Sequence, residues 1–310
     1  MFSQALVLRG SSLRHNTRFE RPGNEAAYDM TPLLVILVLG AALLHAIWNA
    51  MAKSGGRPEF AIGAYQLVGS VVCLTLVPFV APPAPESWPL LAASVILHNF
   101  YYFTLAQAYR AGDLSQVYPL FRGLAPVLVA GGAAAVAGEW LSLGTTIGIV
   151  TISAGIISLA FRGASLGSMP PKAMFWGLIT CVLIASYTIV DGLGVRAANS
   201  EFGYIVWLFV FEVVPIGIIL LSTQRASWLA YMRENKTLAV IGGVASSGAY
   251  GLVIFAMTLG AMAVVSSLRE TSVIFAAVIG AMFLREPFGA ARIRAAALIA
   301  VGIGLMRWLG

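Results

Sequence analysis

The sequence predicts an all-α polytopic membrane protein with ten transmembrane helices, and three observations lead to this fold class. Of 310 residues, 59% are hydrophobic and 10% are charged, whereas about 25% of the residues in soluble domains are charged. The high hydrophobic and low charged content argues against a soluble enzyme, a nucleic-acid-binding protein and a disordered chain. In addition, one pattern of residues occurs twice along the chain. Long stretches contain no Asp, Glu, Lys or Arg, among them residues 33–52, 60–85, 87–109, 140–161, 173–190 and 237–268.

The uncharged stretches are long enough to cross a bilayer as helices. A transmembrane helix needs about 20 mostly apolar residues, and charges and turn residues divide the chain into segments of that length. Runs such as 35–44 and 147–160 do not alternate as the strands of a membrane barrel do. The loops that remain are too short for a soluble domain. The ten predicted spans are residues 32–52, 60–80, 88–109, 116–137, 142–161, 173–193, 203–222, 238–259, 263–284 and 289–308.

Smaller features complete the assignment of elements. Gly243, Ser247 and Gly251 recur every four residues and predict close packing of their helix against neighbours. The two cysteines lie within predicted spans and show no metal-ligand or redox spacing, so we expect no metal and no cofactor. Residues 1–29 contain four arginines with interspersed acids. We expect a disordered N-terminal extension there, or a true start of translation at Met30.

The repeated pattern divides the chain into two halves. A shift of 147 residues carries Arg122 onto Arg269 and Glu139 onto Glu286, and a shift of 142 aligns residues 45–49 with 187–191. We therefore expect a five-helix unit at residues 30–162 and a second at 163–310. Because five is odd, the second unit should be inverted relative to the first. Inverted repeats place a binding site at their interface and suit alternating access.

The ten spans, the paired halves and one motif resemble a known family. The motif reads GEWLS at residues 138–142 and REPFG at residues 285–289, each at the end of a predicted helix. In these features the chain resembles the EamA family of the drug/metabolite transporter superfamily. The segments HAIWN at 45–49, VYPLFRG at 117–123 and LRETS at 268–272 further resemble a bacterial subgroup associated with phosphonate utilisation. The resemblance implies a transporter of small organic solutes in the bacterial inner membrane.

Polar and aromatic side chains at i, i+3 and i+4 spacing form stripes on several predicted helices. Such stripes must face protein or water rather than lipid. We interpret them as the lining of a hydrated central cavity; the alternative is that they hold the bundle together through interhelical hydrogen bonds. The candidate substrate-binding residues are His45, Trp48, Asn49, His98, Tyr102, Tyr118, Arg122, Tyr187, Tyr250, Arg269 and Ser272.

Three acidic residues within or near the spans are candidates for coupling transport to an ion gradient: Glu212, Glu270 and Asp191. Glu212 is the deepest of them, and we expect it to load and release a proton unless it forms a static ion pair with an arginine. Asp191 lies near the end of its predicted span, so it is also open to interpretation as a marker of the membrane interface.

Arg122 and Arg269 occupy equivalent places in the two units. Arginine binds carboxylate and phosphate groups through two parallel hydrogen bonds, so the pair predicts an anionic group on the substrate. The alternatives are that both side chains snorkel to the headgroups or pair permanently with Glu212, Glu270 or Asp191.

The sequence thus predicts a secondary active transporter that works by alternating access, with proton coupling or exchange, on a small organic solute for which the arginine pair predicts an anionic group. An intramembrane enzyme or a channel is the alternative, but no paired catalytic groups or repeated filter element are visible. We expect contact with the lipid bilayer and none with nucleic acid; monomer and homodimer are both open. Six Lys or Arg lie on the side of the N-terminus and eleven on the other side, which predicts that both termini are outside.

Overall fold

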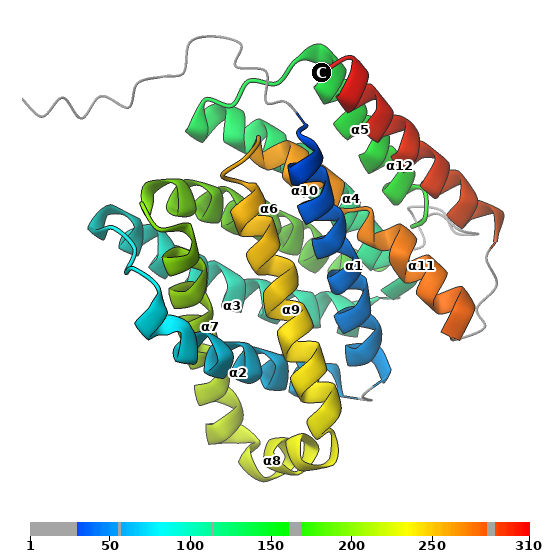
Figure 1. Ribbon diagram of the computed structural model, residues 1–310. Coiled ribbons are helices and arrows are strands. Elements are labelled where there is room, and N and C mark those ends of the chain that lie inside the picture. Colours follow the sequence, from blue (N-terminus) through cyan, green and yellow to red (C-terminus); the bar gives the residue numbers. More distant parts are fainter. Residues whose placement is uncertain (1–29, 55–56, 113, 161–168, 284–288) are drawn as a thin grey trace, which may run out of the picture.

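The computed structural model describes residues 30–54, 57–112, 114–160, 169–283 and 289–310, and these contain helices and no strand (Figure 1). The predicted N-terminal extension and residues 285–288 of the second helix-end motif lie outside this description. The helices are α1 Pro32–Ser54, α2 Pro58–Leu76, α3 Trp88–Ala111, α4 Leu114–Ala137, α5 Leu143–Ile157, α6 Pro171–Ala197, α7 Glu201–Thr223, α8 Arg225–Glu234, α9 Lys236–Ala256, α10 Met262–Arg269, α11 Ser272–Phe283 and α12 Ala290–Trp308, with 3-10 turns at Val77–Phe79 and Pro85–Ser87.

Seven of these helices are long and apolar enough to cross a membrane: α1, α2, α3, α4, α6, α7 and α9. Each corresponds to a predicted span, so the all-helical, multi-pass architecture is confirmed. The other three predicted spans are also helical but differ in form. The fifth is the 15-residue α5, the ninth is divided into α10 and α11, and α12 carries three arginines. The total of ten crossings therefore stays a prediction.

The division of the ninth span occurs at Glu270 and Thr271. The backbone N–H of Glu270 donates to the carbonyl of Ser267, and that of Thr271 donates to Leu268. These are three-residue hydrogen bonds, which tighten the chain as in a 3-10 turn and interrupt the α-helical ladder. Neither glycine nor proline stands at the break, so the sequence pattern gave no signal of it.

The helices pair in a pattern that fits two equivalent halves. Helix α1 packs along α9, and α3 packs along α6, while α2 packs on α7 and α5 on α12. If each of the first five spans is exchanged with the corresponding span of the second five, the α1–α9 pair becomes the α3–α6 pair. The α2–α7 and α5–α12 pairs stay the same under this exchange. Figure 1 shows α5 and α12 side by side at one edge of the molecule. This pairing is the one expected of a five-helix unit used twice.

Small residues allow the close packing that the sequence predicted for α9. A Cβ atom on Gly243 would lie 2.6 Å from the Cβ of Val68 in α2, and one on Gly69 would lie 2.0 Å from the hydroxyl of Ser247. These spacings are shorter than real Cβ contacts, so only glycine fits. The backbones of α2 and α9 therefore approach each other closely.

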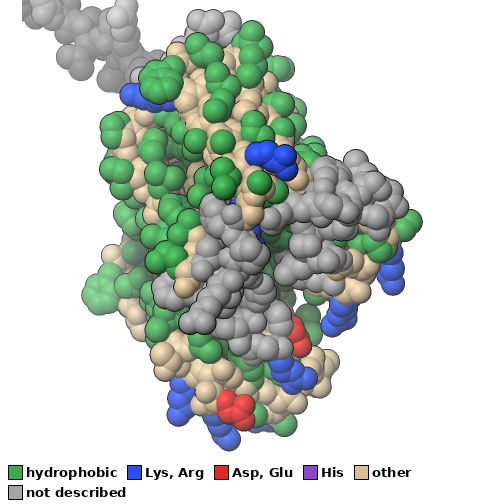
Figure 2. Space-filling view, turned by 90° about the vertical axis from the view of Figure 1, so that its right-hand side faces the viewer, with side chains coloured by type: hydrophobic (Ala, Val, Ile, Leu, Met, Phe, Trp, Pro, Cys, Tyr) green, Lys and Arg blue, Asp and Glu red, His purple; other side chains and the backbone are tan. Residues whose placement is uncertain are grey.

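The outer surface is apolar over much of the bundle. Figure 2 shows one face on which hydrophobic side chains predominate in the upper part, with charged side chains mainly towards the lower end and the edges. Ile36, Val136 and Ile218 are 68%, 68% and 63% exposed, respectively. Exposed aliphatic side chains on membrane-spanning helices suit contact with lipid tails.

Candidate functional site

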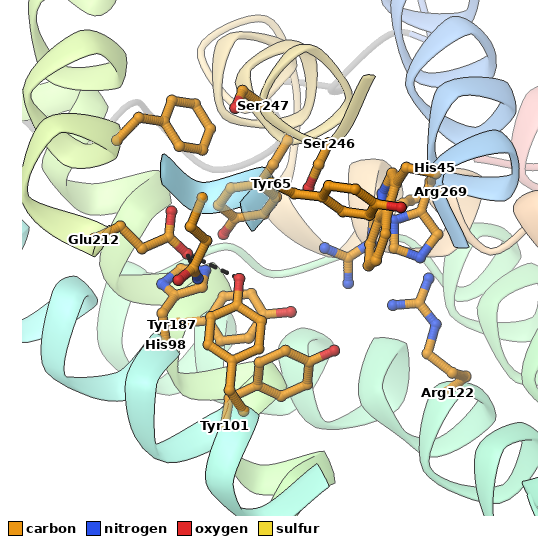
Figure 3. A pocket seen from close by; sticks show the side chains of 15 residues that line it. His45, Tyr65, His98, Tyr101, Arg122, Tyr187, Glu212, Ser246, Ser247 and Arg269 are labelled. Carbon is orange, nitrogen blue, oxygen red and sulfur yellow. Dashed lines mark hydrogen bonds between the residues drawn. The ribbon is translucent and has the colours of Figure 1, made fainter. Parts of the chain in front are cut away.

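A cavity of about 70 Å³ lies at the centre of the bundle (Figure 3). Its volume has room for several water molecules or part of a small solute. Helices of both halves contribute side chains to it, namely α1 to α4 from the first half and α6, α7, α9 and α10 from the second. The residues that line it are His45, Trp48, Tyr65, Gln66, His98, Tyr101, Tyr102, Arg122, Tyr187, Phe209, Glu212, Ser246, Ser247, Tyr250 and Arg269.

Most of the residues selected from the sequence come together here. Five others do not line the cavity. The amide of Asn49 donates to the carbonyl of His45 one turn earlier, and the Tyr118 ring lies 5.9 Å from the Arg122 guanidinium carbon. Glu270 and Asp191 lie behind lining residues, as described below, and Ser272 is buried at the start of α11. The predicted residues that line the cavity are His45, Trp48, His98, Tyr102, Arg122, Tyr187, Glu212, Tyr250 and Arg269.

Two arginines and one glutamate form a buried cluster at one end of the cavity. Arg122 Nε lies 2.9 Å from Glu270 Oε2, and Arg269 Nε lies 3.7 Å from Glu270 Oε1. The arginines are 3% exposed and Glu270 is fully buried. The snorkelling alternative for Arg122 and Arg269 is therefore wrong in this conformation, because burial leaves neither guanidinium at the surface. The alternative of pairing with Glu270 describes what is seen.

Glu212 lies at the other end of the cavity, and its partners are neutral. The hydroxyl of Tyr102 donates to Glu212 Oε1 over 2.9 Å, and the Gln66 amide lies 3.5 Å from the same oxygen. The Asn99 amide donates to the backbone carbonyl of Glu212. Within the described part of the chain no cation pairs with this carboxylate. Its charge is held by hydrogen bonds alone.

Asp191 is fully buried inside the bundle. Its two carboxylate oxygens accept hydrogen bonds from the hydroxyls of Tyr204, at 3.0 Å, and Tyr250, at 2.6 Å. Helix α6 extends to Ala197, four residues beyond the predicted end of the span, so Asp191 lies within the helix. Because Tyr250 lines the cavity, Asp191 fixes the position of one wall.

His98 belongs to the same wall. Its ring stacks on Tyr187 with 4.0 Å between centroids and meets Tyr250 edge-on at 5.2 Å. The Nδ1 atom lies 3.0 Å from the carbonyl oxygen of Ser94. The same atom lies 3.1 Å from the Ser94 hydroxyl. Nδ1 therefore donates to the carbonyl in one tautomer and accepts from the hydroxyl in the other.

The sequence analysis missed part of the lining. Tyr65, Gln66 and Phe209 were not selected, although Ser70 lies one turn from Gln66 and Glu212 one turn from Phe209. Tyr101 and Ser246 share faces with selected residues at helical spacing and could have been found by that signal.

The first helix-end motif has a structural task outside the cavity. Glu139 is 2% exposed and pairs with Arg196 of α6. Its second oxygen accepts from the backbone N–H of Met262, the first residue of α10, where a negative charge also suits the helix dipole. Arg196 donates in turn to the carbonyls of Met257 and Gly260. The motif thus ties the end of α4 to the beginning of α10, and so joins the two halves.

No group of three His, Cys, Asp or Glu side chains among the described residues is arranged to hold a metal ion. The two ends of the cavity carry different charged groups, which suit different chemistry. The arginine cluster can bind an oxyanion, and Glu212 can accept a proton or a hydrogen bond. The aromatic side chains between them can contact an organic body.

Comparisons with known proteins agree with this architecture. The model of the EamA-like transporter family matches residues 171–308. A solved structure described only as the crystal structure of a protein superposes with a TM-score of 0.70 over 89% of this chain and 96% of its own, at 16% sequence identity. That likeness concerns the fold alone, and it extends over both halves. No curated protein matches the chain. The chain is therefore a multi-pass membrane protein whose residues 171–308 match the model of the EamA-like transporter family.

Proposed function

We propose that this protein is a secondary active transporter, not an enzyme, that moves a small organic solute across the bacterial inner membrane. The observation that carries the proposal is the central cavity, which has buried charges of both signs and walls from both halves of the chain. Intramembrane ionisable residues mark substrate and ion pathways in membrane proteins. The family match to residues 171–308 supports transport in general.

Alternating access fits the arrangement of the helices. We infer that the halves are inverted repeats, in line with the pairing of α1 with α9 and of α3 with α6. Transporters built in this way bind substrate near discontinuous helices at the repeat interface. The break between α10 and α11 lies next to Arg269, which lines the cavity. Movement at this break provides a way to expose the cavity to each side in turn.

The substrate carries an anionic group in this proposal. Arg122 and Arg269 reach the cavity from different halves, and within the described part of the chain the Nη2 atom of each is buried without a hydrogen-bond acceptor. Buried donors are normally satisfied in folded proteins. An oxyanion of the substrate, such as a carboxylate or a phosphonate, supplies the missing acceptors.

Glu212 is the proposed coupling residue. A buried carboxylate held by neutral donors can take up or release a proton without breaking an ion pair, and Glu212 has only such donors on its carboxylate in the described structure. His98 and Asp191 lie close enough to interact with it electrostatically. They offer a route by which the proton exchanges with the rest of the cavity.

The test of the function is counterflow in proteoliposomes that contain the purified protein. Vesicles loaded with unlabelled amino acids, organophosphonates or cationic dyes are diluted into the same labelled compound. A carrier accumulates label transiently, whereas a channel does not and an enzyme forms product. Absence of counterflow for every compound, with channel-like flux or product formation instead, overturns the proposal.

Glu212→Gln separates coupling from transport. The amide keeps the size and hydrogen bonding of the side chain but cannot take up a proton. Uptake driven by a proton gradient should be abolished, while exchange between equal substrate pools should continue at a rate close to the wild type. Glu234→Gln, on the exposed end of α8, is the matched control and should retain both activities. If both activities survive in Glu212→Gln, the residue is structural.

A further inference from the structure

We propose that Glu270 sets the charge of the substrate that the cavity accepts and restricts it to anions with a single negative charge. The inference rests on the proposed transport of an anionic solute and concerns the same cavity. It assigns Glu270 a role in specificity, in place of the role in ion coupling that the sequence suggested.

The first observation is the stoichiometry of the cluster. Glu270 places one carboxylate oxygen 2.9 Å from Arg122 Nε and the other 3.7 Å from Arg269 Nε. One carboxylate thus serves two guanidinium groups, and all three side chains are almost completely buried. The cluster keeps a net single positive charge. It is therefore already half neutralised before a substrate enters.

The second observation is the unfilled hydrogen-bonding capacity of the arginines. Arg122 Nη2 and Arg269 Nη2 are buried and have no acceptor among the residues that the structure describes, although each guanidinium carries five N–H donors. Figure 3 shows Arg122 and Arg269 at the same end of the cavity, away from Glu212. The donors that Glu270 leaves free are thus at the end where the head group of a solute would bind.

The third observation is the position of Glu270 in the chain. It stands at the break between α10 and α11, where the hydrogen bonds are three-residue turns. Every residue of α10 is buried, and Glu270, which follows directly after it, is also fully buried. Glu270 is therefore a fixed part of the anion site and is not a surface counter-ion that salt could replace.

The charge balance then determines the preferred ligand. An oxyanion with one negative charge neutralises the cluster, whereas one with two charges leaves an excess negative charge in a buried site. Uncompensated buried charge is strongly unfavourable. Replacing Glu270 by a neutral residue leaves two positive charges, and the same reasoning then favours a doubly charged anion.

The experiment measures binding without transport. Purified protein is titrated with two pairs of matched anions, methanesulfonate against sulfate and propionate against succinate, at pH 7.5. The rise in thermal unfolding temperature with concentration gives the apparent affinity of each anion. For the wild type we expect the singly charged member of each pair to bind more tightly. For Glu270→Gln we expect the order to reverse, with a change of about tenfold or more in the ratio of affinities, equivalent to about 1.4 kcal/mol.

Two further variants keep the test decisive if Glu270→Gln folds poorly. Glu270→Asp retains the charge and should keep the wild-type preference. The double variant Arg122→Gln/Glu270→Gln restores a single positive charge and should again favour the singly charged anions, although more weakly because one guanidinium is lost. Together they separate the net charge of the cluster from damage to the fold.

The proposal is overturned if Glu270→Gln still binds the singly charged anions more tightly than the doubly charged ones. If Glu270→Gln folds poorly, the proposal is overturned when the double variant binds the doubly charged anions more tightly. It is also overturned if none of the four anions stabilises either protein. If none of the anions binds but the wild type still shows counterflow of an uncharged or cationic solute, the proposed transport function stands and only the inference about Glu270 fails. The failure of this inference is thus distinguishable from the failure of the proposed function.

Discussion

The charged side chains around the cavity are held by partners of different kinds. Arg122 and Arg269 share a carboxylate, Glu212 accepts from a phenol and an amide, and Asp191 accepts from two phenols. A charge with a charged partner is hard to neutralise, whereas a carboxylate with neutral partners can change its protonation state. The two ends of the cavity are therefore suited to different tasks, anion binding and proton exchange.

Conservative replacement of the arginines tests the first of these tasks. Arg122→Lys and Arg269→Lys keep the charge but lose the planar, two-pronged donor geometry. Loss of such hydrogen bonds removes roughly 1.5–3 kcal/mol, so the apparent affinity for an anionic substrate should fall about ten- to hundredfold. Arg225→Lys, on the exposed surface of α8, is the control. Wild-type affinity in both cavity variants, at equal expression, contradicts the role in substrate binding.

For single residues, the sequence predicted which side chains line the cavity better than it predicted which side chains contact each other. Helical spacing identified His45, Trp48 and Tyr250 as members of polar stripes, and the cavity contains them. The pairing of Arg122 with Glu270 brings together residues 148 positions apart, and no periodicity encodes such a contact. Gln66 was not selected, although Tyr65 and Ser70 lie near it on the same helix.

Helices α5 and α12 pack along each other, and glycines determine how closely they approach. A Cβ on Gly148 would lie 2.6 Å from the backbone oxygen of Gly302 and 2.4 Å from Met306 Cγ. Gly302 has the reciprocal contact with the backbone oxygen of Gly148. The two backbones thus touch, which is the packing that small residues permit in membranes.

Gly148→Val should destabilise this pair. The added side chain meets backbone that cannot move aside, and overpacking of this kind costs about 1–3 kcal/mol or more. The unfolding temperature of the protein in detergent should therefore fall by several degrees. Gly40→Ala is the matched control, because a Cβ there has nothing within 4 Å; alanine should leave the temperature unchanged or raise it slightly. Equal losses in both variants argue against the close contact.

Helix boundaries were predictable, but interruptions and surface helices were not. Hydrophobic length placed the long helices within a few residues, and Pro171 and Ser200 mark the beginnings of α6 and α7 as expected from helix N-terminal preferences. Helix α8 was missed because its ten residues are too few to span a bilayer, begin and end with charged side chains, and bury only Trp228 and Tyr231. The break at Glu270 lacks any helix-breaking residue, so tertiary contacts must determine it.

For the molecule as a whole, the distribution of Lys and Arg predicts the orientation in the membrane. With the ten predicted spans, eleven Lys or Arg lie in or beside the loops opposite the N-terminus, against six on its own side. Basic loops stay in the cytoplasm, so both termini should face outward. A C-terminal fusion to alkaline phosphatase should be active, and a fusion to green fluorescent protein should be dark. Strong fluorescence without phosphatase activity would reverse the assignment.

The pairing of helices across the halves has a consequence for the biosynthesis of the protein. Helix α1 packs on α9 and α3 on α6, and the amide at the beginning of α10 binds Glu139 of the first half. A nascent chain that has inserted only its first five spans therefore still exposes the faces that await the second half. Such intermediates are the species that quality-control proteases and chaperones recognise. Premature stop codons anywhere before the last helices should thus yield fragments that the cell degrades, even though residues 171–308 alone match the family model.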